Sequence, residues 1–324
     1  AASRVKAWPK VKSAIELGVL YCKATGNYRP CGKENPETGH PFTDKMSKQR
    51  IFQANFSKLP VNICVITFSS DHSTEHDHYP MITRCLDSIL ENTDPENYRL
   101  HIGCNNLSPR AMEFIDKMVT EHGAVKYIGD AMQDRDGNMV YPKYPLMRRI
   151  YQATGGRQST REAADWVVWF DDDSYVTSND WLEKLQDKIN ATPRVHQLGR
   201  LRAILLSKND RQWLRKFPWF NREIGIPRAT FENGKTGRAY NFIEGGFYAL
   251  SRHAINTCSL PDERLFHNRG DWSTGLALLH KGLGVGDFTY GVEIDAEPRR
   301  GMHCDRQVKA DDPAMAEKKW IIDL

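Results

Sequence analysis

The feature that most restricts the fold is a regular alternation of strand-like and helix-like segments that begins near residue 60. Val61–Phe68 is an apolar-rich run with the length of one buried strand. Pro80–Glu91 spaces its apolar residues as an amphipathic helix requires. A second strand is predicted at Tyr98–Cys104, a helix N-cap at Ser108 and a third strand at Val125–Ile128. Later strands are predicted at Ala203–Ser207 and Glu244–Ser251. This order predicts right-handed βαβ units, hence an α/β protein with a Rossmann-like, mostly parallel sheet flanked by helices.

A second constraint lies where an apolar run meets three consecutive aspartates. Trp166–Phe170 predicts a buried strand, and it leads directly into Asp171, Asp172 and Asp173. In open α/β sheets, ligands bind in the crevice beyond the carboxyl ends of the strands. Neighbouring carboxylates oppose one another's ionisation, and a divalent cation with a preference for oxygen ligands, Mg²⁺ or Mn²⁺, removes that repulsion. The pattern therefore predicts a metal site, with a solvated acidic turn as the alternative.

Other candidate site residues each have a structural alternative. Arg148 precedes the acidic site and suits a diphosphate contact, or it belongs to a solvated helix face. Gly245 and Gly246 permit close approach of a ligand to the backbone, or form a bulge. Asp271 in the first turn of a helix is a helix cap or a general base. His303 could complete an aspartate-rich metal site or lie on the surface.

Composition narrows the classes of protein without naming a partner. The chain has 324 residues, 40% hydrophobic and 27% charged, which is typical of a soluble globular protein. No run is long enough to span a membrane, and no signal peptide is visible. Seven scattered cysteines favour reduced thiols in the core. These observations favour a soluble, cytoplasmic protein, with the Golgi lumen as the alternative if a membrane anchor has been trimmed.

Taken in order, the motifs resemble those of a known enzyme family. The segment DWVVWFDDDSYV (Asp165–Val176) resembles its strand and DDD metal motif. The segment EGGFYALSR (Glu244–Arg252) is similar to its paired-glycine element, with aromatic residues replacing small ones after the glycines. The segment GDWSTG (Gly270–Gly275) resembles its ED-x-x-x-G element, with Gly270 in place of the acid. The chain thus resembles GT-A-fold glycosyltransferases, most closely the β-1,3-glycosyltransferase family that includes Fringe and the core 1 galactosyltransferase.

The resemblance implies a metal-dependent, inverting transfer of a sugar from a nucleotide-diphosphate sugar to a hydroxyl acceptor, and a UDP-sugar is the expected donor. It implies a glycosyltransferase domain over residues 59–305, which leaves an N-terminal extension of unknown role (1–58) and a C-terminal tail (306–324). The base would be Asp271. The Mn²⁺ or Mg²⁺ ligands would be Asp171, Asp173 and His303. The donor-binding residues would be Thr67, Asn105, Asp130, Arg148, Asp172, Gly245 and Gly246.

Two other classes stay open at this stage. A metal-dependent nucleotidyltransferase or phosphohydrolase also uses clustered aspartates, but the chain lacks a phosphate-cradling glycine loop after its first strand. A non-catalytic sugar- or nucleic-acid-binding module would use Arg194–Arg238, where 11 Lys/Arg face 3 Asp/Glu and aromatic residues are interspersed. An acid in the cleft, Asp271, distinguishes an enzyme from a binder. The acceptor is a glycan, a protein or a nucleic acid, modified DNA included.

Overall fold

The computed structural model describes residues 60–68, 78–133, 139–154, 166–206, 212, 228–230, 235–260 and 270–294. Its strands are β1 (Val61–Phe68), β2 (Tyr98–Asn105), β3 (Val125–Ile128), β4 (Met132–Gln133), β5 (Met139–Val140), β6 (Trp166–Asp171), β7 (Ser174–Val176), β8 (Val195–Leu205), β9 (Arg228–Thr230), β10 (Thr236–Ser251), β11 (Gly284–Asp287) and β12 (Val292–Ile294). Its helices are α3 (Tyr79–Asn92), α4 (Pro109–His122), α5 (Lys143–Ala153), α6 (Trp181–Ala191), α8 (Arg252–Cys258) and α9 (Gly270–His280), with a short 3₁₀ turn, η2 (Pro95–Asn97).

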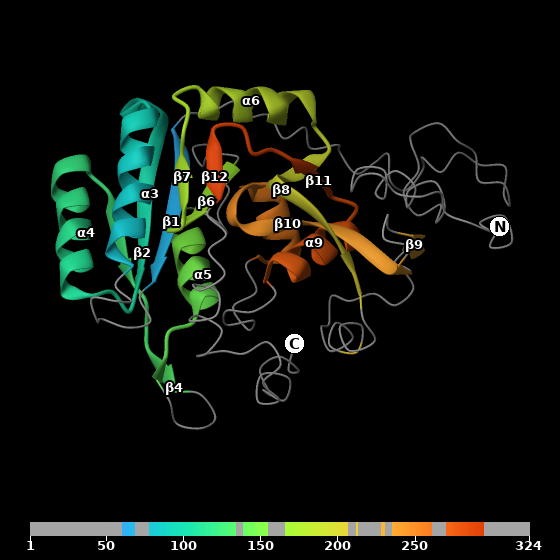
Figure 1. Cartoon of the computed structure of the whole chain (residues 1–324), viewed down its shortest axis with the longest axis horizontal. Coiled ribbons are helices and arrows are strands. Elements are labelled where there is room, and N and C mark those ends of the chain that lie inside the picture. Colours follow the sequence, from blue (N-terminus) through green and yellow to red (C-terminus); the bar gives the residue numbers. More distant parts are fainter. Residues whose placement is uncertain are drawn as a thin grey trace, which may run out of the picture.

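One mixed sheet organises the described residues (Figure 1). Its strand order is β11-β8-β10-β6-β1-β2-β3, and β9 pairs with β10 at one end. β10 is antiparallel to both of its neighbours, β6 and β8, while the remaining pairs in this order are parallel. The predicted α/β class with a mostly parallel sheet is confirmed, and the two antiparallel pairings of β10 are its main departure from a fully parallel arrangement.

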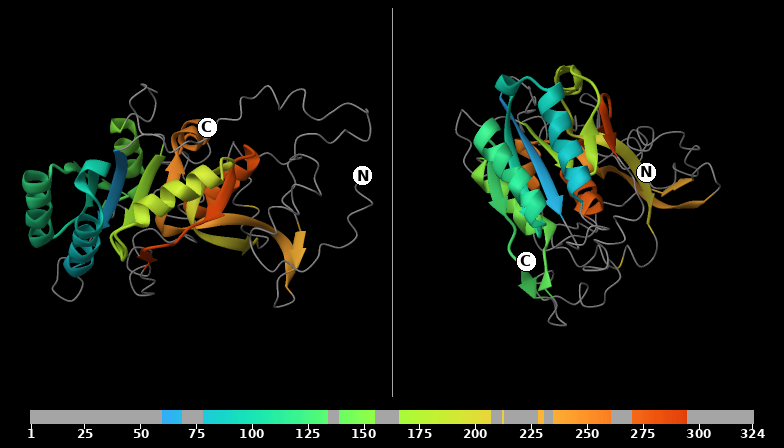
Figure 2. Two further views of the ribbon diagram at one scale, coloured as in Figure 1. Left: turned by 90° about the horizontal axis from the view of Figure 1, so that it is seen from above. Right: turned by 60° about the vertical axis from the view of Figure 1, so that its left-hand side comes forward.

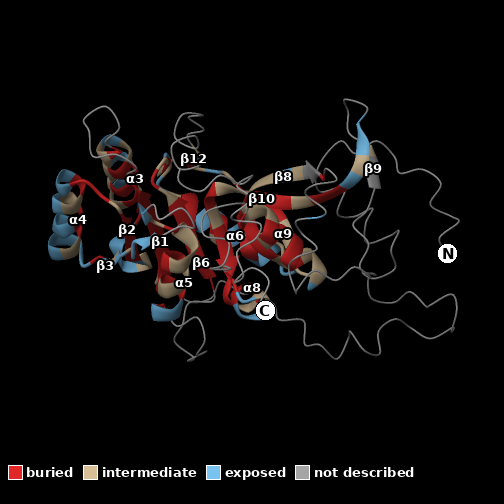
Figure 3. Cartoon of the chain, turned by 90° about the horizontal axis from the view of Figure 1, so that it is seen from below, coloured by how far each residue is buried: buried red, intermediate tan, exposed pale blue. Residues whose placement is uncertain are grey.

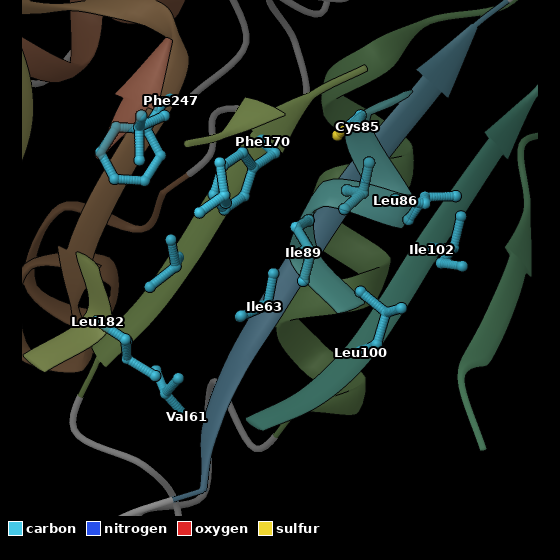
Figure 4. Packing of buried hydrophobic residues seen from close by; sticks show 14 of the residues in the cluster. Val61, Ile63, Cys85, Leu86, Ile89, Leu100, Ile102, Phe170, Leu182 and Phe247 are labelled. Carbon is cyan, nitrogen blue, oxygen red and sulfur yellow. The ribbon is translucent and has the colours of Figure 1, made fainter. Parts of the chain in front are cut away.

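Helices cover both faces of the sheet (Figure 2). Side chains alternate along a strand, so β1 contributes Val61, Ile63 and Val65 to one face and Cys64 and Ile66 to the other. The first set packs with α3, α4 and α6, and the second with α5, α8 and α9. The buried residues in Figure 3 therefore follow the strands and the inner sides of the helices. Figure 4 shows part of the hydrophobic cluster that contains Val61 and Ile63. Two-sided burial explains why β1 and β6 are nearly continuous apolar runs.

Local signals account for the helix boundaries. Ser108 caps α4, as predicted, because its hydroxyl accepts a hydrogen bond from the amide of Ala111 at 3.3 Å. The same helix ends at Gly123, whose φ of +67° is the left-handed conformation common after helices. The apolar face of α6, which includes Trp181 and Leu185, is buried. Trp181 also donates its indole N–H to Thr93 at 2.9 Å, which fixes α6 against the end of α3.

Two strands are longer than the sequence predicts. β8 begins at Val195 rather than at Ala203, and β10 begins at Thr236 rather than at Glu244. The added residues of β10 form a hairpin with β9 at one end of the sheet (Figure 1). The predicted extension 1–58, the tail 306–324 and His303 lie outside the described residues.

Two predictions from composition can be compared with the described residues. Cys64, Cys85 and Cys104 are buried free thiols, and Cys258 is a partly buried one, as the sequence predicts for core cysteines. Among the helices that the structure describes, none has the length and apolar character needed to cross a membrane.

Candidate functional site

The candidate site begins at the carboxyl end of β6. Asp171 is the last residue of this strand, and its side chain is 28% exposed. On one side β6 pairs with the parallel strand β1, and on the other with β10, where Phe170 lies opposite Phe247. Because β10 runs in the opposite direction, Gly245 and Gly246 come alongside the end of β6. Asp171 thus meets the paired glycines at the edge of the sheet where ligands bind in α/β proteins.

Asp172, the middle residue of the triplet, lies inside the protein. Its side chain is fully buried, and Oδ2 accepts a hydrogen bond from the backbone amide of Phe68 at 2.9 Å. This contact joins the end of β6 to the end of β1. Asp171 and Asp173 are partly exposed, so they are the members of the triplet that solvent or a ligand reaches.

Lys143 is a site residue that the sequence analysis missed. Its ammonium lies 2.5 Å from Oδ1 and 2.7 Å from Oδ2 of Asp171, and its side chain is only 15% exposed. Lys143 is also the first residue of α5, where the helix dipole disfavours a positive charge. The signal that could have identified it is a lysine in the first turn of a helix, where the helix dipole makes a positive charge unfavourable unless an acid lies beside it.

Asp271 lies in the first turn of α9 and belongs to the same site. Its Oδ1 accepts a hydrogen bond from the backbone amide of Trp272 at 2.8 Å. Burial raises the pKa of Asp271 from 3.8 to about 6, against hydrogen bonding from the amides of Trp272 and Gly245 and the positive charge of Lys143. Asp271 therefore lies near both Lys143 and Gly245. With a pKa of about 6 it is ionised at neutral pH and is a stronger base than an ordinary aspartate.

A partly buried tyrosine fills the space beside Gly270. A Cβ atom at Gly270 would collide with the phenol of Tyr144, the residue after Lys143 on α5. Burial raises the pKa of Tyr144 well above its usual value, and the nearby negative charges of Asp271 and Asp171 add to this effect. The neutral phenol thus packs against the start of α9. This packing leaves no room for a side chain at position 270, so a glycine fits there.

The paired glycines have different structural roles. Gly246 has a φ of +102°, and a Cβ there would lie 2.6 Å from Cγ2 of Ile294 and 3.2 Å from Oγ of Ser174. Gly246 is therefore required by the backbone and by close packing. A Cβ at Gly245 would meet no atom within 4 Å, so this position faces open space. Of the two, Gly245 is the one that leaves room for a ligand beside Asp271.

The strand ends of the first half of the sheet hold polar side chains that bond to the protein's own backbone. Thr67 is fully buried, and its hydroxyl donates to the carbonyl of Gly103 at 2.8 Å. Asn105 is also buried and donates to the carbonyl of Tyr141 at 2.7 Å. Both residues lie at or next to the carboxyl ends of their strands, and these hydrogen bonds are made within the chain.

The remaining donor-binding candidates lie farther along α5 and after β3. Asp130 is 83% exposed and pairs with Arg149 at 3.0 Å. Arg148 donates to the carbonyl of Leu260 at 3.0 Å and to the hydroxyl of Ser259 at 2.8 Å. Arg148 therefore connects α5 to the turn after α8. The described contacts give it a structural role and do not bring it to the carboxylates.

Asp171 and Asp173 are the carboxylates at this end of the sheet that could supply oxygen ligands to a hard divalent ion. In the part of the chain that the structure describes, no group of three or more His, Cys, Asp or Glu is placed to hold a metal by itself. Mg²⁺-type sites use one or two carboxylates together with substrate phosphates, so a smaller set of protein ligands is sufficient. Asp171 already binds a cation, the ammonium of Lys143. This cation marks the position where positive charge is stabilised.

Little of the basic segment Arg194–Arg238 can be placed. Residues 213–227, which include most of its aromatic side chains, lie outside the described residues. Among the described ones, Arg200 and Arg202 both approach Oε2 of Glu244, at 3.7 Å and 2.9 Å. These two arginines are therefore partly neutralised within the protein.

The fold and site define an α/β protein in which two carboxylates, Asp171 and Asp271, lie close to the ammonium of Lys143 at the carboxyl end of β6. No protein-family model and no curated protein sequence matches this chain. Among solved structures, it is similar to glucosyl-3-phosphoglycerate synthase from Mycobacterium tuberculosis, determined with Mn²⁺, UDP and phosphoglyceric acid. The two chains share 13% identity over 82% of this chain and 81% of that chain, with a TM-score of 0.46. A similarity this remote assigns neither a family nor an activity.

Proposed function

We propose that this protein is a metal-dependent glycosyltransferase with a GT-A fold, which moves a sugar from a nucleotide-diphosphate sugar to a hydroxyl acceptor with inversion. The supporting observation is that two carboxylates from distant parts of the chain lie close to one ammonium at the carboxyl end of β6. Asp171 is the last residue of β6, and Asp271 lies in the first turn of α9. Lys143 lies close to both. The open space at Gly245 lies beside Asp271. A donor and an acceptor that react there would lie between Asp171, which binds a cation, and Asp271, which would act as the base.

In this proposal Asp271 is the general base. Its carboxylate takes the proton of the acceptor hydroxyl while the acceptor oxygen forms a bond to the anomeric carbon of the sugar. The bond between that carbon and the diphosphate oxygen breaks, and its electron pair leaves with the nucleotide. A single in-line displacement inverts the anomeric configuration. The raised pKa of Asp271 favours its accepting a proton from a hydroxyl near neutral pH.

The metal-binding residues in this proposal are Asp171, Asp173 and, from outside the described residues, His303. A bound Mn²⁺ or Mg²⁺ would stabilise the negative charge that develops on the leaving diphosphate. Gly245 would allow the donor to approach the backbone. Thr67, Asn105 and Asp130 would line the nucleoside end of the crevice, and UDP is the nucleotide we expect.

The alternatives account for less of the site. A nucleotidyltransferase or phosphohydrolase of the two-metal type needs carboxylates that hold two ions, whereas the proposed sugar transfer needs one. A sugar-binding or nucleic-acid-binding module needs no general base, whereas the position of Asp271 beside Lys143 and Gly245 suits one. The acceptor stays open between glycans, proteins and nucleic acid. We retain the proposed glycosyltransferase domain at residues 59–305.

The first test is nucleotide binding and its dependence on metal. Calorimetric titration with UDP should give a Kd that weakens at least tenfold when Mn²⁺ is removed by chelation. Asp173→Ala with Mn²⁺ should behave like the chelated wild type, and a screen of UDP-sugars with glycan, peptide and DNA acceptors should then yield a product. UDP affinity that neither chelation nor Asp173→Ala changes would remove the metal from the mechanism. A steep loss of acceptor binding with salt would select nucleic acid.

A further inference from the structure

The ion pair between Lys143 and Asp171 differs from the other ion pairs of the described residues in its degree of burial. The exposed side-chain fractions are 15% and 28%, whereas Lys126 and Asp116, a comparable pair between β3 and α4, are 28% and 57% exposed. Both oxygens of Asp171 lie within hydrogen-bonding distance of the Lys143 ammonium. Lys143 therefore neutralises the carboxylate that would bind the metal.

This arrangement has an electrostatic consequence for metal binding. A divalent ion that approaches Asp171 alone has to displace the ammonium or lie beside it, and like charges in a partly buried site repel strongly. The displaced ammonium would also remain at the start of α5, where the helix dipole is unfavourable to a cation. A diphosphate removes both difficulties, because it supplies negative charge for the metal and for the ammonium together.

We propose that Lys143 occupies the cation position on Asp171 in the free protein and transfers to the diphosphate when the donor binds, so that metal and nucleotide bind cooperatively. This inference rests on the proposed function and adds a donor-binding residue to it. Lys143 is then responsible for two opposite effects. It weakens the binding of the metal alone, and it strengthens the binding of the nucleotide once the metal is present.

The charge of Lys143 also acts on the other side of the site. It lowers the pKa of Asp271 relative to burial alone, which places the ammonium close enough to influence both carboxylates. Movement of the ammonium from Asp171 toward a diphosphate would therefore occur within the same crevice. No rearrangement of the sheet is required, because Lys143 has a long flexible side chain at the start of a helix.

The test is a set of calorimetric titrations on the full chain with Mn²⁺ alone, with UDP alone, and with UDP in the presence of Mn²⁺. In the wild type, UDP should raise the affinity for Mn²⁺, and Mn²⁺ should raise that for UDP by the same factor, since coupling is reciprocal. Lys143→Met keeps the length of the side chain and removes its charge. It should bind Mn²⁺ alone about tenfold more tightly and UDP with Mn²⁺ about tenfold more weakly, within the usual range of coupling between sites.

The matched control is Lys126→Met, which removes a lysine–aspartate pair between β3 and α4 and should change neither affinity. Lys143→Met that binds Mn²⁺ and UDP as the wild type does would overturn the proposal while leaving the glycosyltransferase function intact. If Lys143→Met does not fold, the wild type still decides, because Mn²⁺ affinity that is the same with and without UDP overturns it too. A wild type that binds neither UDP nor Mn²⁺ would reject the proposed function and this inference together.

Discussion

The two halves of the sheet use their strand ends in different ways. In the half formed by β1, β2 and β3, Thr67 and Asn105 are buried and donate hydrogen bonds to carbonyls of the chain itself. In the half formed by β6 and β10, Asp171 at the end of β6 pairs with the ammonium of Lys143. The charge of the same ammonium acts on Asp271 in the first turn of α9. The comparison teaches that a position at the ligand-binding edge does not by itself define a reactive site. The kind of partner that satisfies the side chain also matters.

The physical reason is the difference between neutral and charged groups. A buried hydroxyl or amide is satisfied by one or two backbone groups and then contributes to stability. A partly buried carboxylate keeps a large electrostatic free energy that changes whenever a cation, a proton or a substrate arrives. The first half of the sheet is therefore expected to provide shape, and the second half is expected to provide chemistry.

The largest expected effect comes from Asp271→Asn. Asparagine caps a helix about as well as aspartate, so the fold and UDP binding should remain. Sugar transfer should fall by about 10² to 10⁴-fold, the usual contribution of a general base. Turnover numbers and the anomeric configuration of the product are the measurements. Asp180→Asn, a change in the acid that precedes α6, is the control and should leave turnover unchanged. Wild-type turnover in Asp271→Asn, or retention of configuration, would remove Asp271 from the role of base.

The next effect is on stability and separates the paired glycines. Gly246→Ala places a Cβ against Ile294 at a φ of +102°, so it should lower the free energy of unfolding by about 1–3 kcal/mol. Gly245→Ala meets no atom within 4 Å and should leave that free energy nearly unchanged, yet weaken UDP binding. Denaturant unfolding and UDP titration of both variants distinguish these outcomes. Equal stability of the two variants would contradict the different roles assigned to them.

A smaller effect is the pH dependence of turnover. The pKa of Asp271 is raised to about 6, and a base must be ionised, so turnover should be level above pH 6 and fall about tenfold per unit below it. The same shift has the opposite sign for stability. Because the folded-state pKa lies above 3.8, this group stabilises the fold below pH 4, and that contribution is lost as the pH rises through 6. Asp271→Asn should therefore have a higher Tm than the wild type at pH 7.5, with the difference vanishing below pH 4.

The smallest effect is expected in the first half of the sheet. Asp130 is 83% exposed, and its pair with Arg149 is a surface ion pair, so Asp130→Asn should change the free energy of unfolding by less than about 0.5 kcal/mol. If Asp130 contacts the nucleoside, UDP affinity should decrease several-fold in the same variant. An unchanged Kd for UDP would mean that other residues bind the nucleoside. The end of β3 would then provide no ligand contact through Asp130, in contrast to the role proposed for the end of β6.

The fold was largely predictable because its signals are local and strong. β1 and β6 are nearly continuous apolar runs, and Ser108 is followed by an amphipathic helix, so these elements were predicted within a residue or so of their observed bounds. β8 was only partly predicted because Arg200 and Arg202 interrupt its apolar pattern. Both arginines pair with Glu244 on the neighbouring strand β10, and such cross-strand pairing cannot be read from one segment alone.

The site was less predictable than the fold. The motif around Asp171–Asp173 and the helix start at Asp271 were identified, but their proximity in space depends on the register of β10 against β6. The inward direction of Asp172 depends on the amide of Phe68, about a hundred residues earlier in the chain. Lys143 could not be told from Arg148 by sequence, because only the fold shows that Lys143 bonds to Asp171 while Arg148 bonds to the turn after α8. Long-range partners decide such orientations.

The antiparallel strand β10 has a consequence for how the protein is made. β10 pairs with β6 on one side and β8 on the other, although it follows β6 by more than sixty residues. A growing polypeptide therefore leaves the ribosome with the backbone of Trp166–Phe170 unpaired along one edge. Exposed apolar edges of this kind recruit other chains and lead to aggregation. A fragment that stops before β10 would carry the same liability, so the protein should be expressed and studied with β10 present.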